Sequence, residues 1–430
     1  MPPHLPSGPA LQDPRYQAVL AERGRREAAT ARGVSVLTAE DAAGPRTSLR
    51  VPELLLGFLL AMEAYTLPAG GVPVPLNEAA MMVLLGLALC RRAKRRASAL
   101  GVAALLAVLV GVYLAAVSLA MGVPDAVWLR RLVRMAALTA LVGCFAARRV
   151  DLRSVLTGLL AAMAVNVPLF YAGLVPAPYQ GFLTGFLADK NVAGLYYAAV
   201  PVLALTFVRR PGVRLLLLSA SGLCVFLTGS RTSLAGFACA LVWVVLTPRM
   251  GPVLRVALLA LLAWAVGFAE ENLARVGVYS DREGTDWFRS VIQTATGVKV
   301  EATPWTGQGL AQSFVELDAG RFLFHNSYAA LYVEGGVVLT AAMLTAYAVY
   351  GLRLGATRLR TPSRVAVEAA AVVVLVTATQ LGEVFVSIPS MLILAAGATL
   401  AITEADAPLD AQARARREER TLRQAAARGH

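Results

Sequence analysis

Long apolar stretches alternate with short polar connections from residue 51 to residue 403. A helix needs roughly 20 apolar residues to cross a bilayer. The pattern therefore predicts an all-α integral membrane protein with about twelve transmembrane helices. We expect them over residues 51–69, 74–90, 98–121, 131–147, 154–175, 191–208, 213–229, 232–247, 252–270, 326–352, 364–383 and 386–403.

The same pattern divides the chain into three parts. Residues 1–50 lack the apolar core of a signal peptide and predict a cytoplasmic, partly disordered tail. Residues 51–403 form the polytopic membrane domain, which includes one long connection over about 270–325. Residues 404–430 mix Arg, Glu and Ala and predict a second cytoplasmic tail.

Arginine clusters fall on alternate connections, which predicts the orientation in the membrane. Positively charged loops stay cytoplasmic, so both termini are expected inside and the 270–325 connection outside, in a bacterial inner membrane. A net charge of +13 could indicate a nucleic-acid partner, but only 16% of residues are charged and the basic runs flank apolar stretches. We interpret them as topology signals, with membrane lipids as partners and no nucleic acid.

His325 is the one histidine in the body of the chain, at the junction of the external connection and the next apolar stretch. Imidazole titrates near neutrality and can accept a proton there. The alternative is a structural histidine bonded to a loop carbonyl.

Arg231 stands in a polar break, Thr228 to Ser233, between two apolar stretches. A guanidinium at the external surface is costly without a partner, and its planar fork matches phosphate oxygens. It either binds a pyrophosphate head group or reaches toward phospholipid head groups.

The external connection carries two further arginines, Arg282 and Arg289, on either side of Trp287. The spacing of Trp287, Val291 and Ile292 predicts a short amphipathic helix on the membrane surface. The arginines either bind an anionic ligand or pair with acidic neighbours in the same segment.

Three weaker signals are also external by this topology. Arg130, Arg131 and Arg134 violate the positive-inside rule and predict an anionic-lipid site or a surface anchor. Lys190 can meet phosphate while Asn191 caps a helix. The Pro304 to Gly309 segment, with Gly-x-Gly, makes a turn or brings backbone amides to an anion.

Taken in order, these short motifs resemble the O-antigen ligase/polymerase family over about residues 185–340. The resemblance rests on Asn191, Gly229-Ser230-Arg231, Arg282 before Trp287, Pro304 with Gly307-x-Gly309, and His325-Asn326 followed by Glu334-Gly335-Gly336. In the family the loop arginine commonly stands closer to its tryptophan, so both Arg282 and Arg289 stay candidates.

The resemblance implies a multi-helix fold similar to GT-C glycosyltransferases, with a long periplasmic loop over a cavity at the membrane surface. It implies a glycan donor on undecaprenyl pyrophosphate and a glycan or lipid acceptor. Arg231 and Arg282 or Arg289 would hold the pyrophosphate, and His325 would orient or deprotonate the acceptor hydroxyl, with Asn326 beside it in substrate binding. Two arginines can neutralise the leaving group, so we expect no metal or cofactor. Direct attack of the acceptor hydroxyl on the anomeric carbon would invert its configuration.

Several functions fit this prediction. A ligase, a polysaccharide polymerase and a protein-directed glycan transferase share the donor and differ in the acceptor, which the sequence does not identify. From another class, a lipid-linked glycan flippase or secondary transporter would also have about twelve transmembrane helices. It should carry polar residues in mid-membrane. Here the main acidic exceptions in the apolar stretches, several of them near predicted helix ends, are Glu63, Glu78, Glu334, Glu368 and Glu383.

Overall fold

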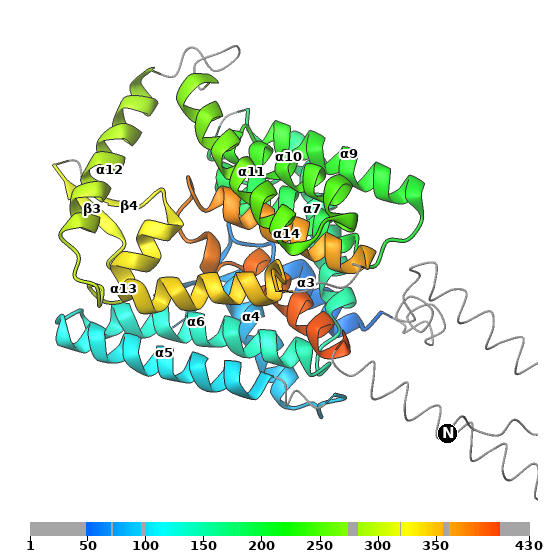
Figure 1. The fold of residues 1–430 in the computed structure, drawn as a ribbon, viewed down its shortest axis with the longest axis horizontal. Coiled ribbons are helices and arrows are strands. Elements are labelled where there is room, and N and C mark those ends of the chain that lie inside the picture. Colours follow the sequence, from blue (N-terminus) through cyan, green and yellow to red (C-terminus); the bar gives the residue numbers. More distant parts are fainter. Residues whose placement is uncertain are drawn as a thin grey trace, which may run out of the picture. The chain divides into compact units, whose positions relative to one another are not determined.

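The computed structural model of the protein describes residues 49–69, 72–95, 100–179, 181–273, 283–318, 320–355 and 361–404. They form a mostly helical structure with two short antiparallel hairpins (Figure 1). The α-helices are α3 (Val51–Leu59), α4 (Leu76–Leu89), α5 (Gly101–Ala120), α6 (Asp125–Ala146), α7 (Leu152–Tyr171), α8 (Lys190–Ala204), α9 (Pro211–Leu227), α10 (Arg231–Leu246), α11 (Pro252–Leu273), α12 (Glu283–Glu301), α13 (Ser327–Ala346), α14 (Pro362–Thr377) and a final helix, Ile388–Glu404. Short helical turns are η3 (Gly185–Leu187), η4 (Thr247–Arg249), η6 (Tyr347–Gly351) and η7 (Val384–Val386), and the hairpins pair β1 (Thr66–Ala69) with β2 (Val72–Pro75) and β3 (Phe314–Leu317) with β4 (Gly320–Leu323).

Four helices among the described residues are long and apolar enough to cross a membrane, by length and composition. They are Gly101–Ala120, Leu152–Tyr171, Arg231–Arg249 and Ser327–Gly351, and each lies within or close to a predicted stretch. Four more apolar helices are shorter: Leu76–Leu89, Pro211–Leu227, Pro252–Phe268 and Ile388–Glu404. The helical membrane character is thus supported, but the described part of the chain does not have twelve full-length apolar helices.

Helix length explains most of the difference between the twelve predicted transmembrane helices and the four long apolar helices of the described residues. The stretch predicted over 51–69 is helical only as far as Leu59 and then enters the β1–β2 hairpin. Helix α14 has 16 residues, about 24 Å at 1.5 Å per residue, against a hydrocarbon core of about 30 Å. Most of its side chains are buried by neighbouring helices. A hydropathy pattern does not distinguish such a buried helix from one that crosses the bilayer in full.

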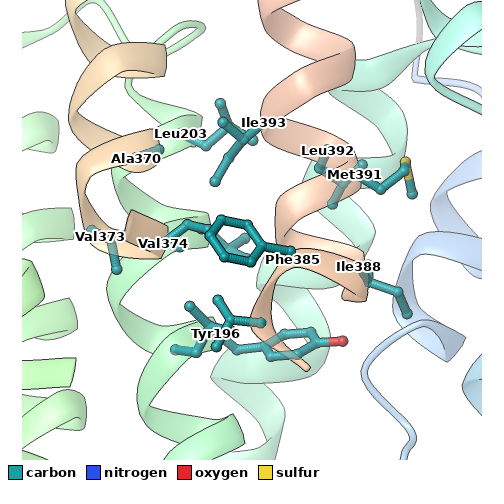
Figure 2. Packing of buried hydrophobic residues seen from close by; sticks show 14 of the residues in the cluster. Tyr196, Leu203, Ala370, Val373, Val374, Phe385, Ile388, Met391, Leu392 and Ile393 are labelled. Atoms are coloured by element: carbon teal, nitrogen blue, oxygen red, sulfur yellow. The ribbon is translucent and has the colours of Figure 1, made fainter. Parts of the chain in front are cut away.

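The central apolar core surrounds α8 and α14. Helix α14 packs against α8 and α10, and α8 also packs against α9. Residues 190–205 contain an almost uninterrupted buried run from Ala193 to Leu205. Phe385, from η7, inserts between α8, α14 and the final helix (Figure 2). The core therefore fixes the segment that joins α14 to the final helix.

Two glycines allow the backbones of α3 and α7 to touch. A methyl group at Gly158 would fall 1.9 Å from the carbonyl oxygen of Leu54, and one at Gly57 would fall 2.2 Å from that of Val155. Small residues at such a contact are typical of helix association in membranes. This contact holds α3, and with it the β1–β2 hairpin, against the bundle.

The long connection between α11 and α13 is structured where it is described. The short helix predicted near Trp287 is present and longer than expected, because α12 has 19 residues. The β3–β4 hairpin follows and leads into His325 and α13 (Figure 1). Arg282 and the two predicted tails, apart from a few residues at their inner ends, lie outside the described residues.

We predict that Gly158→Ala destabilises the protein by about 1–3 kcal/mol, because the added methyl group overlaps the α3 backbone. Thermal unfolding in detergent measures the loss. Gly86→Ala is the matched control, since a methyl group there meets no atom within 4 Å. Equal melting temperatures for Gly158→Ala and wild type would contradict the close contact.

Candidate functional site

His325 lies between the β3–β4 hairpin and the first turn of α13. The next residue, Asn326, caps α13: its side-chain oxygen accepts hydrogen bonds from the backbone N–H groups of Tyr328 at 2.9 Å and Ala329 at 3.1 Å. Both His325 and Asn326 are half-buried. The cap fixes the chain direction at His325 and occupies the Asn326 oxygen, so the predicted role of Asn326 in substrate binding stays a prediction.

A loop formed by residues 378–387, here called the platform, holds the residues on both sides of His325. The backbone N–H of Ser327 donates to the carbonyl of Ala378 at 2.8 Å. The Ser327 hydroxyl donates to the Leu381 carbonyl at 2.5 Å and accepts from the Val384 N–H at 3.0 Å. A methyl group at Gly382 would fall 2.2 Å from the carbonyl oxygen of Phe324. The residues on both sides of His325 are thus held by one loop.

The same platform holds Arg289 of α12. Arg289 Nη2 donates to the Gln380 carbonyl at 2.8 Å, and Gln293 Nε2 donates to Gln380 Oε1 at 3.3 Å. The structure therefore brings together His325 and Arg289, two residues that the sequence separates by a hairpin and part of a helix. No pattern in the sequence predicted the loop that joins them.

The environment of His325 favours its neutral form. Burial lowers the pKa of His325 below its ordinary value of 6.5, and the positive charge of Arg289 lowers it further, while Asp189 acts in the opposite direction. A neutral imidazole has a free ring nitrogen that can accept a proton. The geometry and charge are consistent with a base at position 325.

Asp189, and not Asn191, caps α8, which corrects the sequence prediction. The Asp189 carboxylate accepts hydrogen bonds from the N–H groups of Asn191 at 2.7 Å and Val192 at 3.1 Å. It also accepts one from the Tyr179 hydroxyl at 2.7 Å. A carboxylate suits this position because it also faces the positive end of the helix dipole.

Lys190 and the turn before Arg231 meet at one aromatic ring. Lys190 Nζ lies 5.1 Å from the centre of the Phe182 ring. A methyl group at Gly229, which has φ of +64°, would fall 2.3 Å from a carbon of the same ring. Arg231 begins α10 two residues later, so the helices break at residues 228–230, within the predicted polar stretch. The break is confirmed, and roles for Arg231 and Lys190 in binding stay predictions.

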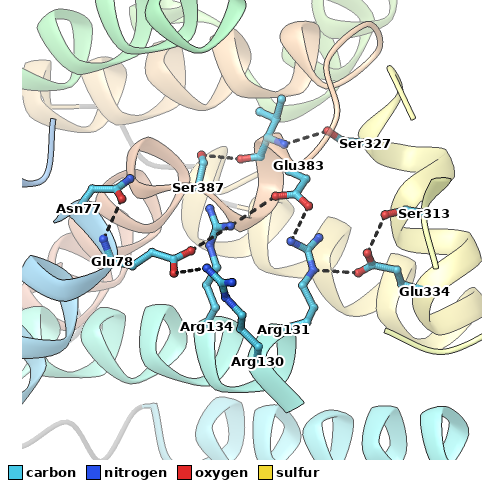
Figure 3. A network of polar contacts seen from close by, with 11 residues as sticks. Asn77, Glu78, Arg130, Arg131, Arg134, Ser313, Ser327, Glu334, Glu383 and Ser387 are labelled. Carbon is cyan, nitrogen blue, oxygen red and sulfur yellow. Dashed lines mark hydrogen bonds and ion pairs between the residues drawn. The ribbon is translucent and has the colours of Figure 1, made fainter. Parts of the chain in front are cut away.

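The three arginines that violated the positive-inside rule lie inside α6 and pair with carboxylates (Figure 3). Arg130 contacts Glu78 at 3.3 Å, and Arg134 contacts both Glu78 at 3.5 Å and Glu383 at 3.4 Å. The Arg131 contacts are the most buried: Nε donates to Glu334 at 3.2 Å and Nη1 lies 2.8 Å from Glu383. We call these six residues the ionic network. Its arginines have protein partners, and binding of an anionic lipid stays a prediction.

Helix α13 is broken at Gly335 and Gly336, and the 304–309 segment fills the break. Gly336 has φ of +60° and ψ of −154°, a conformation essentially confined to glycine. The Val337 N–H donates to the Trp305 carbonyl at 2.9 Å, and the Gln308 N–H donates to the Val333 carbonyl at 2.7 Å. The predicted turn is confirmed by the bond from the Gly307 N–H to the Pro304 carbonyl at 2.8 Å. The break itself was not predicted.

Only two acidic residues in the sequence pointed to the platform and the ionic network. Glu334 and Glu383 stand out as charges within apolar stretches, but their partner on α6 is distant in the sequence.

Within the described ranges, no three His, Cys, Asp or Glu side chains lie together so as to hold a metal ion.

We predict that Gly336→Ala releases the 304–309 segment, because a Cβ there would fall 1.9 Å from the Trp305 carbonyl oxygen. Hydrogen exchange measured by mass spectrometry should then be faster in peptides that contain Gln308 and Val337. Gly297→Ala, where a Cβ meets no atom within 4 Å, should leave the exchange of both peptides unchanged. Wild-type protection in a folded Gly336→Ala variant would argue against the docking.

No protein-family model matches the chain, and none of the curated proteins compared with it matches. The resemblance to the O-antigen ligase/polymerase family therefore stays a prediction that depends on the motifs and on the arrangement of the residues that carry them.

Proposed function

We propose that the protein is a membrane glycosyltransferase that moves a glycan from an undecaprenyl-pyrophosphate donor to an acceptor hydroxyl. The observation that carries this proposal is that one loop, the platform, binds both Arg289 and Ser327, which stands two residues after His325. Arg289 is bonded to this loop, and its positive charge helps to lower the pKa of His325, which stands just before an apolar helix. A base and a permanent cation are the two kinds of group that transfer from a diphosphate requires.

In this mechanism the guanidinium groups bind the leaving group. Arg289 and Arg231 neutralise the pyrophosphate oxygens, which stabilises the charge that develops as the anomeric C–O bond breaks. Arg282 is the alternative loop arginine.

His325 accepts the proton of the acceptor hydroxyl as its oxygen attacks the anomeric carbon from the face opposite the pyrophosphate. The new glycosidic bond forms as the old one breaks, the pyrophosphate leaves with the bonding electron pair, and the configuration inverts.

The rest of the proposal follows from the topology. We place the protein in a bacterial inner membrane, with both termini cytoplasmic and the His325 site on the periplasmic side. The acceptor is a lipid-linked core glycan if the enzyme is a ligase, a growing repeat if it is a polymerase, or a protein if it is a protein-directed glycan transferase. The GT-C-like fold belongs to the same proposal.

A lipid-linked glycan transporter is the second candidate, and one observation favours it. Broken helices are common at transporter substrate sites, and α13 is broken at Gly335 and Gly336. Labelling of a single cysteine at position 325, in a background without the four native cysteines, separates the two classes. Labelling only from outside supports the enzyme, and labelling from both sides in different states supports a transporter.

The direct test is glycan transfer from undecaprenyl pyrophosphate by the purified protein in the presence of EDTA. His325→Ala should lower the rate about 10²- to 10⁴-fold through loss of the base. Arg231→Ala should lower it about 10²- to 10³-fold through loss of charge stabilisation. Arg149→Ala, at a half-buried arginine bonded to the Leu89 carbonyl, is the matched control. No transfer by the wild type, or full activity in both variants, would reject the mechanism.

The pH dependence tests the base more closely, because the rate should fall as His325 becomes protonated. Arg289→Gln removes a charge that lowers the pKa of His325, so the acid limb of kcat/KM should move to higher pH. Asp189→Asn removes the opposing charge but keeps a capping side chain, so the limb should move to lower pH. Shifts in the same direction, or no shift, would exclude His325 as the titrating group.

A further inference from the structure

The platform is fixed on its apolar side by Phe385. This ring is buried in the core and meets Tyr328 edge-on at 5.2 Å and Tyr347 at 5.4 Å between ring centres. Tyr328 belongs to the first turn of α13, only three residues after His325. The apolar side of the platform is therefore packed against the start of α13.

The polar side of the platform depends on Glu383. This residue has φ of +60° and ψ of 14°, the left-handed region, which is unfavourable for a residue other than glycine. Its carboxylate lies 2.8 Å from Arg131 and 3.4 Å from Arg134. The two arginines offset the backbone cost and hold Glu383 in this conformation.

Arg131 also reaches α13 directly. Its Nε donates to Glu334, whose second carboxylate oxygen accepts a hydrogen bond from the Ser313 hydroxyl at 2.7 Å. The side chain of Arg131 is 8% exposed and that of Glu334 1%, so water competes little for these contacts. Arg131 thus joins the platform to the turn of α13 that precedes its break (Figure 3).

We propose that Arg131 and Glu383 are positioning residues, whose ion pair holds the platform so that His325 and Arg289 keep their mutual placement. A catalytic role of this ion pair rests on the proposed function. Its effect on the placement of His325 does not. Arg131 acts through its ion pairs with the carboxylates of Glu334 and Glu383. A lipid-binding role would require it to release one of these carboxylates. The coupling reaches His325 through the bonds of Ser327 and the contact of Gly382 with Phe324.

The coupling can be measured without any transfer assay. Replacing His4 and His430 with Gln leaves His325 as the single histidine, so ¹³C-labelled histidine gives one NMR signal. In Glu383→Gln we expect a broadened signal and a rise of the His325 pKa toward 6.5, because a loosened platform admits water. Loss of the negative charge alone would lower the pKa of His325. The direction of the pKa change therefore distinguishes a loosened platform from a simple charge effect.

Two further variants complete the NMR test. Glu316→Gln breaks an exposed ion pair with Arg321 and should leave the signal unchanged. Gly382→Ala disturbs the platform by its contact with Phe324 without changing charge, and should raise the pKa as Glu383→Gln does. An unchanged or lowered pKa in folded Glu383→Gln and Gly382→Ala, with folding checked by thermal melting, would overturn the proposal.

Transfer kinetics then test the catalytic consequence. Misplacement of about 1 Å can cost about 100-fold in rate, so Glu383→Gln should lower kcat by about 10- to 100-fold and leave the donor KM nearly unchanged. A raised KM with unchanged kcat would assign Glu383 to binding and overturn the positioning role. If the wild type transfers no glycan, the proposed function fails while the NMR result still decides the coupling.

Discussion

The buried guanidinium of Arg131 is the group on which the arrangement of the site depends. A charge removed from water needs partners inside the protein, and losing one partner of a buried ion pair costs about 3–5 kcal/mol. Arg131 meets this requirement with two carboxylates that come from α13 and from the platform. Three segments that are far apart in the sequence are therefore held at fixed distances.

The break in α13 follows from a similar requirement. Backbone groups freed at Gly335 and Gly336 must be satisfied within the protein, and the 304–309 segment supplies a carbonyl and an N–H to do so. The Tyr113 hydroxyl donates to the Thr306 carbonyl at 2.7 Å and ties the same segment to α5. The second half of the long connection is thereby anchored to the bundle close to Glu334.

The chemistry of the site combines a neutral imidazole with a permanent cation. Arg289 serves both properties, since its charge lowers the pKa of His325 and its guanidinium can also meet an anionic leaving group. Asp189 moderates the effect while it caps α8. The platform links the two groups because it binds Arg289 and the residues on both sides of His325. Its own anchors, Phe385 and Glu383, lie in the core and in the ionic network.

The sequence by itself determined the features that depend on neighbouring residues. Apolar stretches predicted the four long helices. The polar run from Thr228 to Ser233 predicted the break before α10, and the spacing around Trp287 predicted α12. Tertiary structure decided the features that depend on distant partners. Hydropathy did not show that α8 and α14 are short and buried, that Asp189 takes the cap expected of Asn191, or that Arg131 meets Glu334 and Glu383. Each of these outcomes depends on which side chains the packed helices bring together, and a pattern read along one chain contains no such distances.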